Sequence, residues 1–185
     1  MYDLFQRKTT TLEFAILGLV NKAPLSGYQL RQEFETTALG NYSSSPGAIY
    51  PALKRLQDSG FVEQIYPNGS KKQKYKCTAD GKKVLKGWFL KEIERKDISH
   101  NLDVLLLRFA FMDNMVSDNQ KVNFLKSLGA RIEEYLEDLT QYHNSLVFKE
   151  QPLTGQLAFK HGLESYATTL KWSQDCIKTL NKKTA

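Results

Sequence analysis

The sequence predicts a mainly α-helical protein with one small β-hairpin, arranged as an amino-terminal domain over 1–98 and a helical domain over 99–185. Apolar residues recur at spacings of three and four along most of the chain, which is the helical period. A single segment, FVEQIYPNGSKKQKYKCT, instead places two short β-rich runs around the turn signal PNGS. Charge also divides the chain: residues 1–90 carry 13 Lys and Arg against 7 Asp and Glu, whereas residues 91–185 carry 13 of each.

The first half is expected to form three helices, a hairpin and a fourth helix. We expect helices at about 11–22, 27–38 and 46–59, strands at about 61–66 and 73–78, and a helix at about 79–96. Ser26 is expected to cap the second helix, which turns Tyr28, Leu30 and Phe34 inward. Ser45 before a proline is a strong start signal for the third helix, because serine accepts hydrogen bonds from free amides and proline loses none at the first position.

The third helix contains an internal proline. Pro51 lacks an N–H group and therefore removes a helical hydrogen bond. Tyr50, just before it, is predicted to point outward, because Ile49, Leu53 and Leu56 share the opposite face. Gly60 ends the helix at a position where a left-handed residue is common.

The second half is predicted to be wholly helical after a hinge near 96–101. Residues 102–113 are apolar on nearly every face, which indicates a buried helix. A helix at about 119–148 carries a coiled-coil-like seam through Leu125, Leu128, Ile132, Tyr135, Leu139, Tyr142 and Leu146. A last helix at about 154–182 repeats the pattern, with polar Ser173 at one seam position.

Three helices followed by a hairpin with a basic tip follow the order of a winged helix-turn-helix. In that arrangement helix 46–59 enters the major groove of DNA, and the wing at 66–76 reaches the phosphates. Serines at the start of the helix suit phosphate oxygens, and lysines suit the wing. The predicted DNA-binding residues are Ser43, Ser44, Ser45, Tyr50, Lys54, Arg55, Lys71, Lys72 and Lys74.

The same residues have a structural explanation. The serines can be caps and a turn, Tyr50 can be a packing residue, and lysines keep an edge hairpin from aggregating. The joint occurrence of these features in the basic half favours double-stranded DNA as partner. The alternative function is a winged-helix interaction module that binds an acidic protein.

Other classes of function find little support in the sequence. His100, His143 and His161 are scattered, and no metal-binding, nucleophile or phosphate-loop motif is present, so we expect no enzyme, no metal and no cofactor. Cys77 and Cys176 lie far apart and are expected to be reduced thiols. No apolar run approaches the ~18 residues of a membrane helix, and MYDLFQRKTT does not resemble a signal peptide. The expected location is cytoplasmic.

Three motifs resemble the PadR family of bacterial transcriptional regulators: SGYQL at 26–30, GAIYPALKRLQDSGFVE at 47–63 and KYKCTADGKKVL at 74–85. The resemblance covers about residues 11–90, and it includes the Tyr-x-x-Thr-x-x-Gly element of Tyr75, Thr78 and Gly81. The second half is similar in length and pattern to the helical domain of larger members. The ten residues before the first helix depart from the usual family form. The resemblance implies a dimeric repressor, and in some members release by a small aromatic effector.

The heptad seams of the second half fit a hairpin within the chain and also a homodimer, and we expect both. We expect the last helix and residues 102–113 to contact a partner chain. The predicted interface residues are Leu105, Phe109, Leu163, Tyr166, Leu170, Ile177 and Leu180. Trp172 and Cys176 form a second stripe, which either packs in the core or lines an effector pocket.

Overall fold

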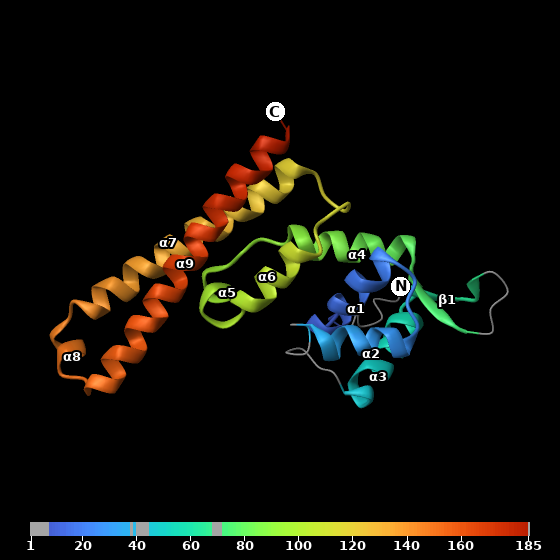
Figure 1. The fold of residues 1–185 in the computed structure, drawn as a ribbon, viewed down its shortest axis with the longest axis horizontal. Helices are drawn as coiled ribbons and strands as arrows, with labels where there is room; N and C mark the ends of the chain where they lie inside the picture. Colours follow the sequence, from blue (N-terminus) through green and yellow to red (C-terminus); the bar gives the residue numbers. More distant parts are fainter. Residues whose placement is uncertain (1–7, 38, 40–44, 68–71, 185) are drawn as a thin grey trace, which may run out of the picture. The chain divides into compact units, whose positions relative to one another are not determined.

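A computed structural model describes residues 8–37, 39, 45–67 and 72–184 (Figure 1). The described residues form helices and one two-stranded antiparallel sheet, which confirms the predicted fold class. The chain forms two compact units, Met1–Phe89 and Leu90–Ala185, each described by itself below. The domain boundary expected between residues 98 and 99 stays a prediction.

The first unit follows the predicted order of elements. Its helices and strands are α1 (Thr11–Lys22), α2 (Gly27–Thr36), α3 (Pro46–Asp58), β1 (Val62–Ile65), β2 (Lys74–Cys77) and α4 (Ala79–Leu90). Both α1 and α2 begin with a capping box, formed by Thr10 with Glu13 and by Ser26 with Gln29. In each box the two side chains satisfy backbone N–H groups that the first turn leaves without helical partners.

Helix α3 packs against both α1 and α2. Its buried face carries Ile49, Leu53 and Leu56, as the sequence predicts. The helix ends where the Gly60 N–H donates to the Gln57 carbonyl. Gly60 has a φ of 72°, a left-handed conformation that costs glycine little and other residues more.

The wing is the β1–β2 hairpin, with Val62 opposite Cys77 and Ile65 opposite Lys74. Leu25, between α1 and α2, adds a further bridge, because its backbone exchanges two hydrogen bonds with Tyr75. The wing is therefore tied to the helices by backbone hydrogen bonds on the side of β2 away from β1.

The Thr-x-x-Gly motif fixes the entry into α4. The Thr78 hydroxyl donates to the Gly60 carbonyl at 2.7 Å and accepts from the Gly81 N–H at 3.0 Å. A Cβ atom at Gly81 would lie 2.1 Å from the Phe61 carbonyl oxygen. Only glycine therefore lets α4 start this close to β1.

Three expectations for the first unit are wrong in detail. Tyr28 does not face inward: its side chain is 63% exposed. Helix α2 ends at Thr36 rather than at 38, and the hydroxyls of Thr36 and Thr37 turn back to carbonyls of the preceding turn. Ser45 stands at the cap position of α3, but its side chain makes no capping hydrogen bond.

In the described residues of the second unit, the regular elements are all helices. It contains α5 (Arg95–His100), α6 (Leu102–Ala110), α7 (Asp118–His143), α8 (Leu146–Lys149) and α9 (Leu153–Thr184). Helices α7 and α9 pack along each other. The Tyr135 and Tyr166 rings meet edge to face at 5.0 Å, and buried Ser173 approaches Gly129, so the two seams join within the chain.

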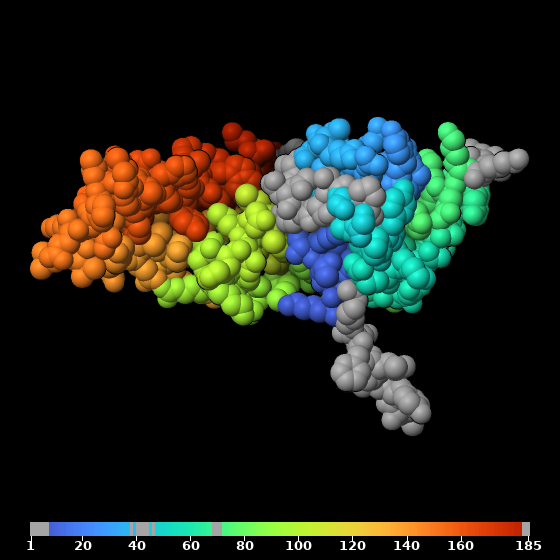
Figure 2. All heavy atoms as spheres, turned by 90° about the horizontal axis from the view of Figure 1, so that it is seen from below, coloured from blue at the N-terminus to red at the C-terminus, as the bar shows by residue number. Residues whose placement is uncertain are grey.

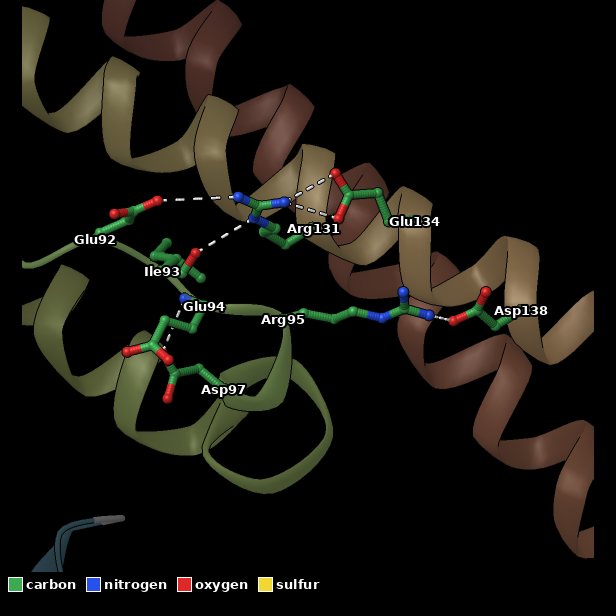
Figure 3. A network of polar contacts seen from close by, with 8 residues as sticks. All are labelled: Glu92, Ile93, Glu94, Arg95, Asp97, Arg131, Glu134 and Asp138. Carbon is green, nitrogen blue, oxygen red and sulfur yellow. Dashed lines mark hydrogen bonds and ion pairs between the residues drawn. The ribbon is translucent and has the colours of Figure 1, made fainter.

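The region expected to be a hinge at 96–101 is instead helix α5. Helix α4 ends at Leu90 rather than at 96, and the chain then runs extended to a capping box of Glu94 and Asp97. Arg131 of α7 donates to the Ile93 carbonyl at 3.3 Å and forms an ion pair with Glu134 (Figure 3). The tertiary hydrogen bond to Ile93 stabilises the extended segment against continuation of the helix.

Two further helices are shorter than expected. The helix predicted over 102–113 ends at Ala110, and Phe111 and Met112 are buried in the segment that follows. The helix predicted over 119–148 breaks after His143. Ser145 accepts from the Phe148 N–H and thereby starts the separate helix α8. Serine and asparagine favour such breaks, because their side chains compete for backbone hydrogen bonds.

Candidate nucleic-acid interface

One face of α3 is exposed. Gly47, Tyr50, Pro51 and Lys54 lie on it, opposite the buried face. Figure 2 shows α3 and the strands of the wing on the same side of the first unit. A helix face about two turns long beside a β-hairpin matches the shape that enters a major groove and grips the flanking backbone.

Tyr50 projects from this face with its side chain 48% exposed. Pro51, the next residue, donates no hydrogen bond to the Gly47 carbonyl, yet the helix continues through it to Asp58. The aromatic ring of Tyr50 therefore stands on a backbone that is fixed by the proline and by buried neighbours on both sides. Its hydroxyl is able to donate to a phosphate or to a base edge.

Lys54 lies one turn further along the exposed face. Its ammonium group is 3.5 Å from the Asp58 carboxylate, and both side chains are largely exposed. Exposed pairs of this kind contribute little stability. The pair therefore leaves the Lys54 charge accessible to an anionic partner.

Arg55 has a different environment from Lys54. Its Nε donates to the Glu13 carboxylate at 2.7 Å, and Glu13 is fully buried beneath it. The second Glu13 oxygen accepts from the Thr10 N–H at 2.9 Å. One buried carboxylate therefore caps α1 and anchors α3, so Arg55 has a structural role whether or not it also contacts DNA.

Glu13 is not among the residues predicted for the site. Its signal was present as the spacing Thr10-x-x-Glu13, which is that of a capping box. The link to Arg55, 42 positions later, depends on how α1 and α3 pack and has no local signal.

The wing supplies further cations. Lys72 is exposed, and Lys74 is half-buried opposite Ile65. Lys76 lies directly opposite Glu63, which places a carboxylate within the lysine cluster and reduces its self-repulsion. Ser43, Ser44 and Lys71 lie outside the described residues. Ser45 lies at the amino end of α3, where helix amides and the helix dipole favour anions.

The residues predicted for a dimer interface lie in the second unit. Leu105 is 2% exposed and belongs to the core of the chain itself, so it offers no surface to a partner. The other predicted interface residues are half-buried: Phe109, Leu163, Tyr166, Leu170, Ile177 and Leu180. Their assignment to a dimer stays a prediction.

Trp172 packs edge to face on Phe109, with 5.6 Å between the ring centroids. Cys176, one turn away, is half-buried, and burial raises the pKa of its thiol. These contacts are those of a packed helix interface, and the predicted effector role of the pair stays a prediction. Nearby, the buried Arg108 guanidinium lies 5.1 Å from the Phe124 ring centroid and donates to the Lys91 carbonyl.

Within the described residues, no group of three or more His, Cys, Asp or Glu side chains is placed to hold a metal ion. The helices of that same part of the chain include none with the length and apolar character of a membrane span.

The sequence of this chain is similar to those of known proteins. Residues 16–87 match the transcriptional regulator PadR-like family. The negative transcriptional regulator PadR of Bacillus subtilis is 25% identical over 181 residues, which cover 92% of this chain and 98% of the relative. Crystal structures of that PadR with p-coumaric acid and with operator DNA are similar at TM-scores of 0.43 and 0.41, with 25% and 24% identity. They cover 93% and 92% of this chain, and 99% of each solved chain.

The family match begins within α1 and runs through α2, α3 and the wing into α4, so it includes the elements that carry the candidate interface. It includes the Tyr50–Pro51 pair and the Thr78 and Gly81 entry into α4. Residues 16–87 therefore form a domain of the transcriptional regulator PadR-like family.

Proposed function

We propose that the protein is a homodimeric repressor that binds a palindromic operator in double-stranded DNA. The observation that carries the proposal is the exposed face of α3 beside a lysine-bearing wing, in the half of the chain that holds all the net positive charge. The negative regulator named among its relatives supports repression rather than activation.

In this proposal the helix at 46–59 lies in the major groove. Tyr50 and Lys54 contact base edges or phosphates, while the amino end of the helix faces the backbone. The wing at 66–76 places Lys72 and Lys74 against phosphates of the same half-site. Phosphate contacts fix the register of the protein, and the α3 contacts select the sequence.

Two copies are required because one α3 helix reads only a few base pairs. A two-fold dimer places two such helices about one DNA turn apart, ~34 Å, on two inverted half-sites. The half-buried seam residues of α9 are the proposed contacts with the partner chain. Such a regulator acts in the cytoplasm, together with the genome, and Trp172 with Cys176 is the proposed place where a small aromatic effector acts.

Selection from a library of random duplexes by the purified protein tests the proposal. We expect an inverted repeat to be enriched, with both halves protected in a footprint, and we expect sedimentation to give a dimer at micromolar concentration. Enrichment of no sequence, together with binding to an acidic protein partner, would support the interaction-module alternative. A monomer with a single protected half-site would contradict the dimer.

The effector is tested separately by titrating p-coumaric acid into the complex of protein and selected duplex. Release of the duplex that is weakened by Trp172→Ala supports the proposed effector site. Release that is unchanged in the variant places the effector elsewhere, and no release removes this compound as the effector.

A further inference from the structure

Gly27, at the first position of α2, lies directly beneath the Tyr50 ring. A Cβ atom added at Gly27 would stand 2.6 Å from Tyr50 Cε1, 3.2 Å from Cζ and 3.3 Å from the hydroxyl oxygen. Real Cβ atoms do not approach carbon atoms to 2.6 Å, because repulsion rises steeply below van der Waals contact. The ring therefore occupies the space that any other residue at position 27 would need.

The backbone of Gly27 gives no other reason for a glycine. It is helical, and among the described glycines the one with a positive φ is Gly60. Alanine is the better helix former, so glycine carries a cost here that its conformation does not require. Close approach of the Tyr50 ring accounts for the residue.

Both sides of this contact are held in place. The turn at Gly27 is fixed by the Ser26–Gln29 capping box, in which the Gln29 N–H donates to Ser26 at 3.2 Å and the Ser26 N–H donates to Gln29 at 3.0 Å. On the other side, Ile49 is fully buried and Leu53 nearly so, which fixes the α3 backbone around Tyr50. The backbone is therefore fixed on both sides of the contact between Gly27 and the Tyr50 ring.

We propose that Gly27 is a positioning residue for DNA recognition: its bare backbone seats the Tyr50 ring and directs the Tyr50 hydroxyl toward DNA. The inference rests on the proposed function, since it assigns a task to Tyr50 within the same interface. It fits the half-exposure of Tyr50, because the Cε1 and hydroxyl end of the ring lies against Gly27.

Two residues that follow Gly27 in α2 add further polar groups to the surface. Tyr28, the residue after Gly27, is exposed, and Arg31 follows one turn later with its Nε 2.6 Å from the Glu35 carboxylate. The pKa of Arg31 is raised mainly by the hydrogen bond to Glu35, and Tyr28 and Tyr50 make smaller contributions. Beside Gly27, the exposed face of α2 therefore carries a second phenol, Tyr28, and the Arg31 guanidinium paired with Glu35, and both can donate hydrogen bonds to phosphate.

The test is Gly27→Ala, measured with a labelled duplex that the unaltered protein has selected from a random library. We expect the affinity to fall about tenfold, the value of one lost hydrogen bond to a charged group. We expect no loss of thermal stability, because the added methyl displaces an exposed ring and alanine favours the helix. A role in folding alone would lower the stability and the affinity together.

Two further variants show whether the loss of affinity is specific to the contact between Gly27 and Tyr50. Gly87→Ala in α4 is the matched control, because a Cβ atom there meets nothing within 4 Å, and we expect unchanged affinity. In a Tyr50→Ala background, Gly27→Ala should cause no further loss, since the ring that it displaces is absent. This non-additivity is the signature of one residue acting through the other.

Failures of the inference and of the proposed function are distinguishable. If the unaltered protein selects no duplex, the proposed function fails and the inference falls with it. If the unaltered protein selects a duplex and the Gly27→Ala variant binds that duplex equally well, the positioning role of Gly27 alone is wrong. An equal loss of affinity from Gly27→Ala with and without the Tyr50 ring would also overturn the role.

Discussion

At the scale of single residues, Cys77 couples the stability of the wing to pH. Its side chain is buried on β2, and burial raises the pKa of its thiol to about 11, with a smaller opposing effect of Lys82. The folded chain therefore keeps the thiol proton at pH values where the unfolded chain, with a thiol near its usual 9.0, has lost it. The stabilisation is complete below about pH 9 and is lost as the pH rises toward 11.

We therefore expect Cys77→Ala to reduce the alkaline loss of stability. The measurement is the free energy of unfolding in urea at a series of pH values from neutral to about 11. Cys176→Ala is the control, because the Cys176 thiol is less buried than that of Cys77. Both variants keep the same tyrosines and lysines, so the titration of those groups contributes equally to both measurements. Equal alkaline slopes for the two variants would show that Cys77 does not carry the effect.

At the scale of elements, the Glu13–Arg55 ion pair determines how α3 is held against α1. We expect Glu13→Gln to lower the free energy of unfolding by about 1–3 kcal/mol, because the buried amide satisfies Arg55 and the Thr10 N–H less well than the carboxylate does. Chemical denaturation measures the change. Glu35→Gln, which breaks the exposed pair with Arg31, is the matched control and should have little effect.

The same variant separates positioning from contact in α3. If Arg55 only anchors the helix, Glu13→Gln and Arg55→Gln should lower duplex affinity and stability in proportion. A loss of affinity confined to Arg55→Gln would show that its guanidinium also reaches DNA. Equal stability of Glu13→Gln and the unaltered chain would contradict the anchoring role.

The elements were predictable from sequence where their signals are local. Helix α1 has the predicted bounds because Thr10 caps its start and Ala23–Pro24 limits its end. The order of helices and wing followed from turn residues such as Gly60. The end of α4 was not predictable, because the extended segment at 91–94 depends on Arg108 and Arg131, which come later in the chain.

The candidate site also contains some residues that the sequence predicts and others that depend on the fold. Outward placement of Tyr50 and Lys54 followed from the helical period, and the lysines of the wing followed from their place beside the turn signal PNGS. The roles of Glu13 and Gly27 were not predictable, since each depends on a contact between helices that are separate in sequence. A glycine in a helix indicates that something comes close, but only the fold shows that it is Tyr50.

At the scale of the whole molecule, the proposed dimer requires a fixed spacing between half-sites. Inserting about five base pairs between the two halves of the selected operator rotates one half-site to the opposite face of the duplex. We expect affinity to fall more than tenfold in a gel-shift titration, close to the affinity for a single half-site. Binding that is insensitive to the insertion would contradict a dimer that holds its two α3 helices at a fixed spacing.

The central claim, that α3 and the wing bind the DNA backbone, is tested most directly by the salt dependence of duplex binding. We expect a steep fall of affinity with salt, and a slope shallower by about 2 in the Lys72→Ala, Lys74→Ala double variant, because each lost phosphate contact removes roughly one released counterion. Lys126→Ala with Lys149→Ala, exposed lysines of the second unit, should leave the slope unchanged. Equal slopes for both double variants would contradict the account.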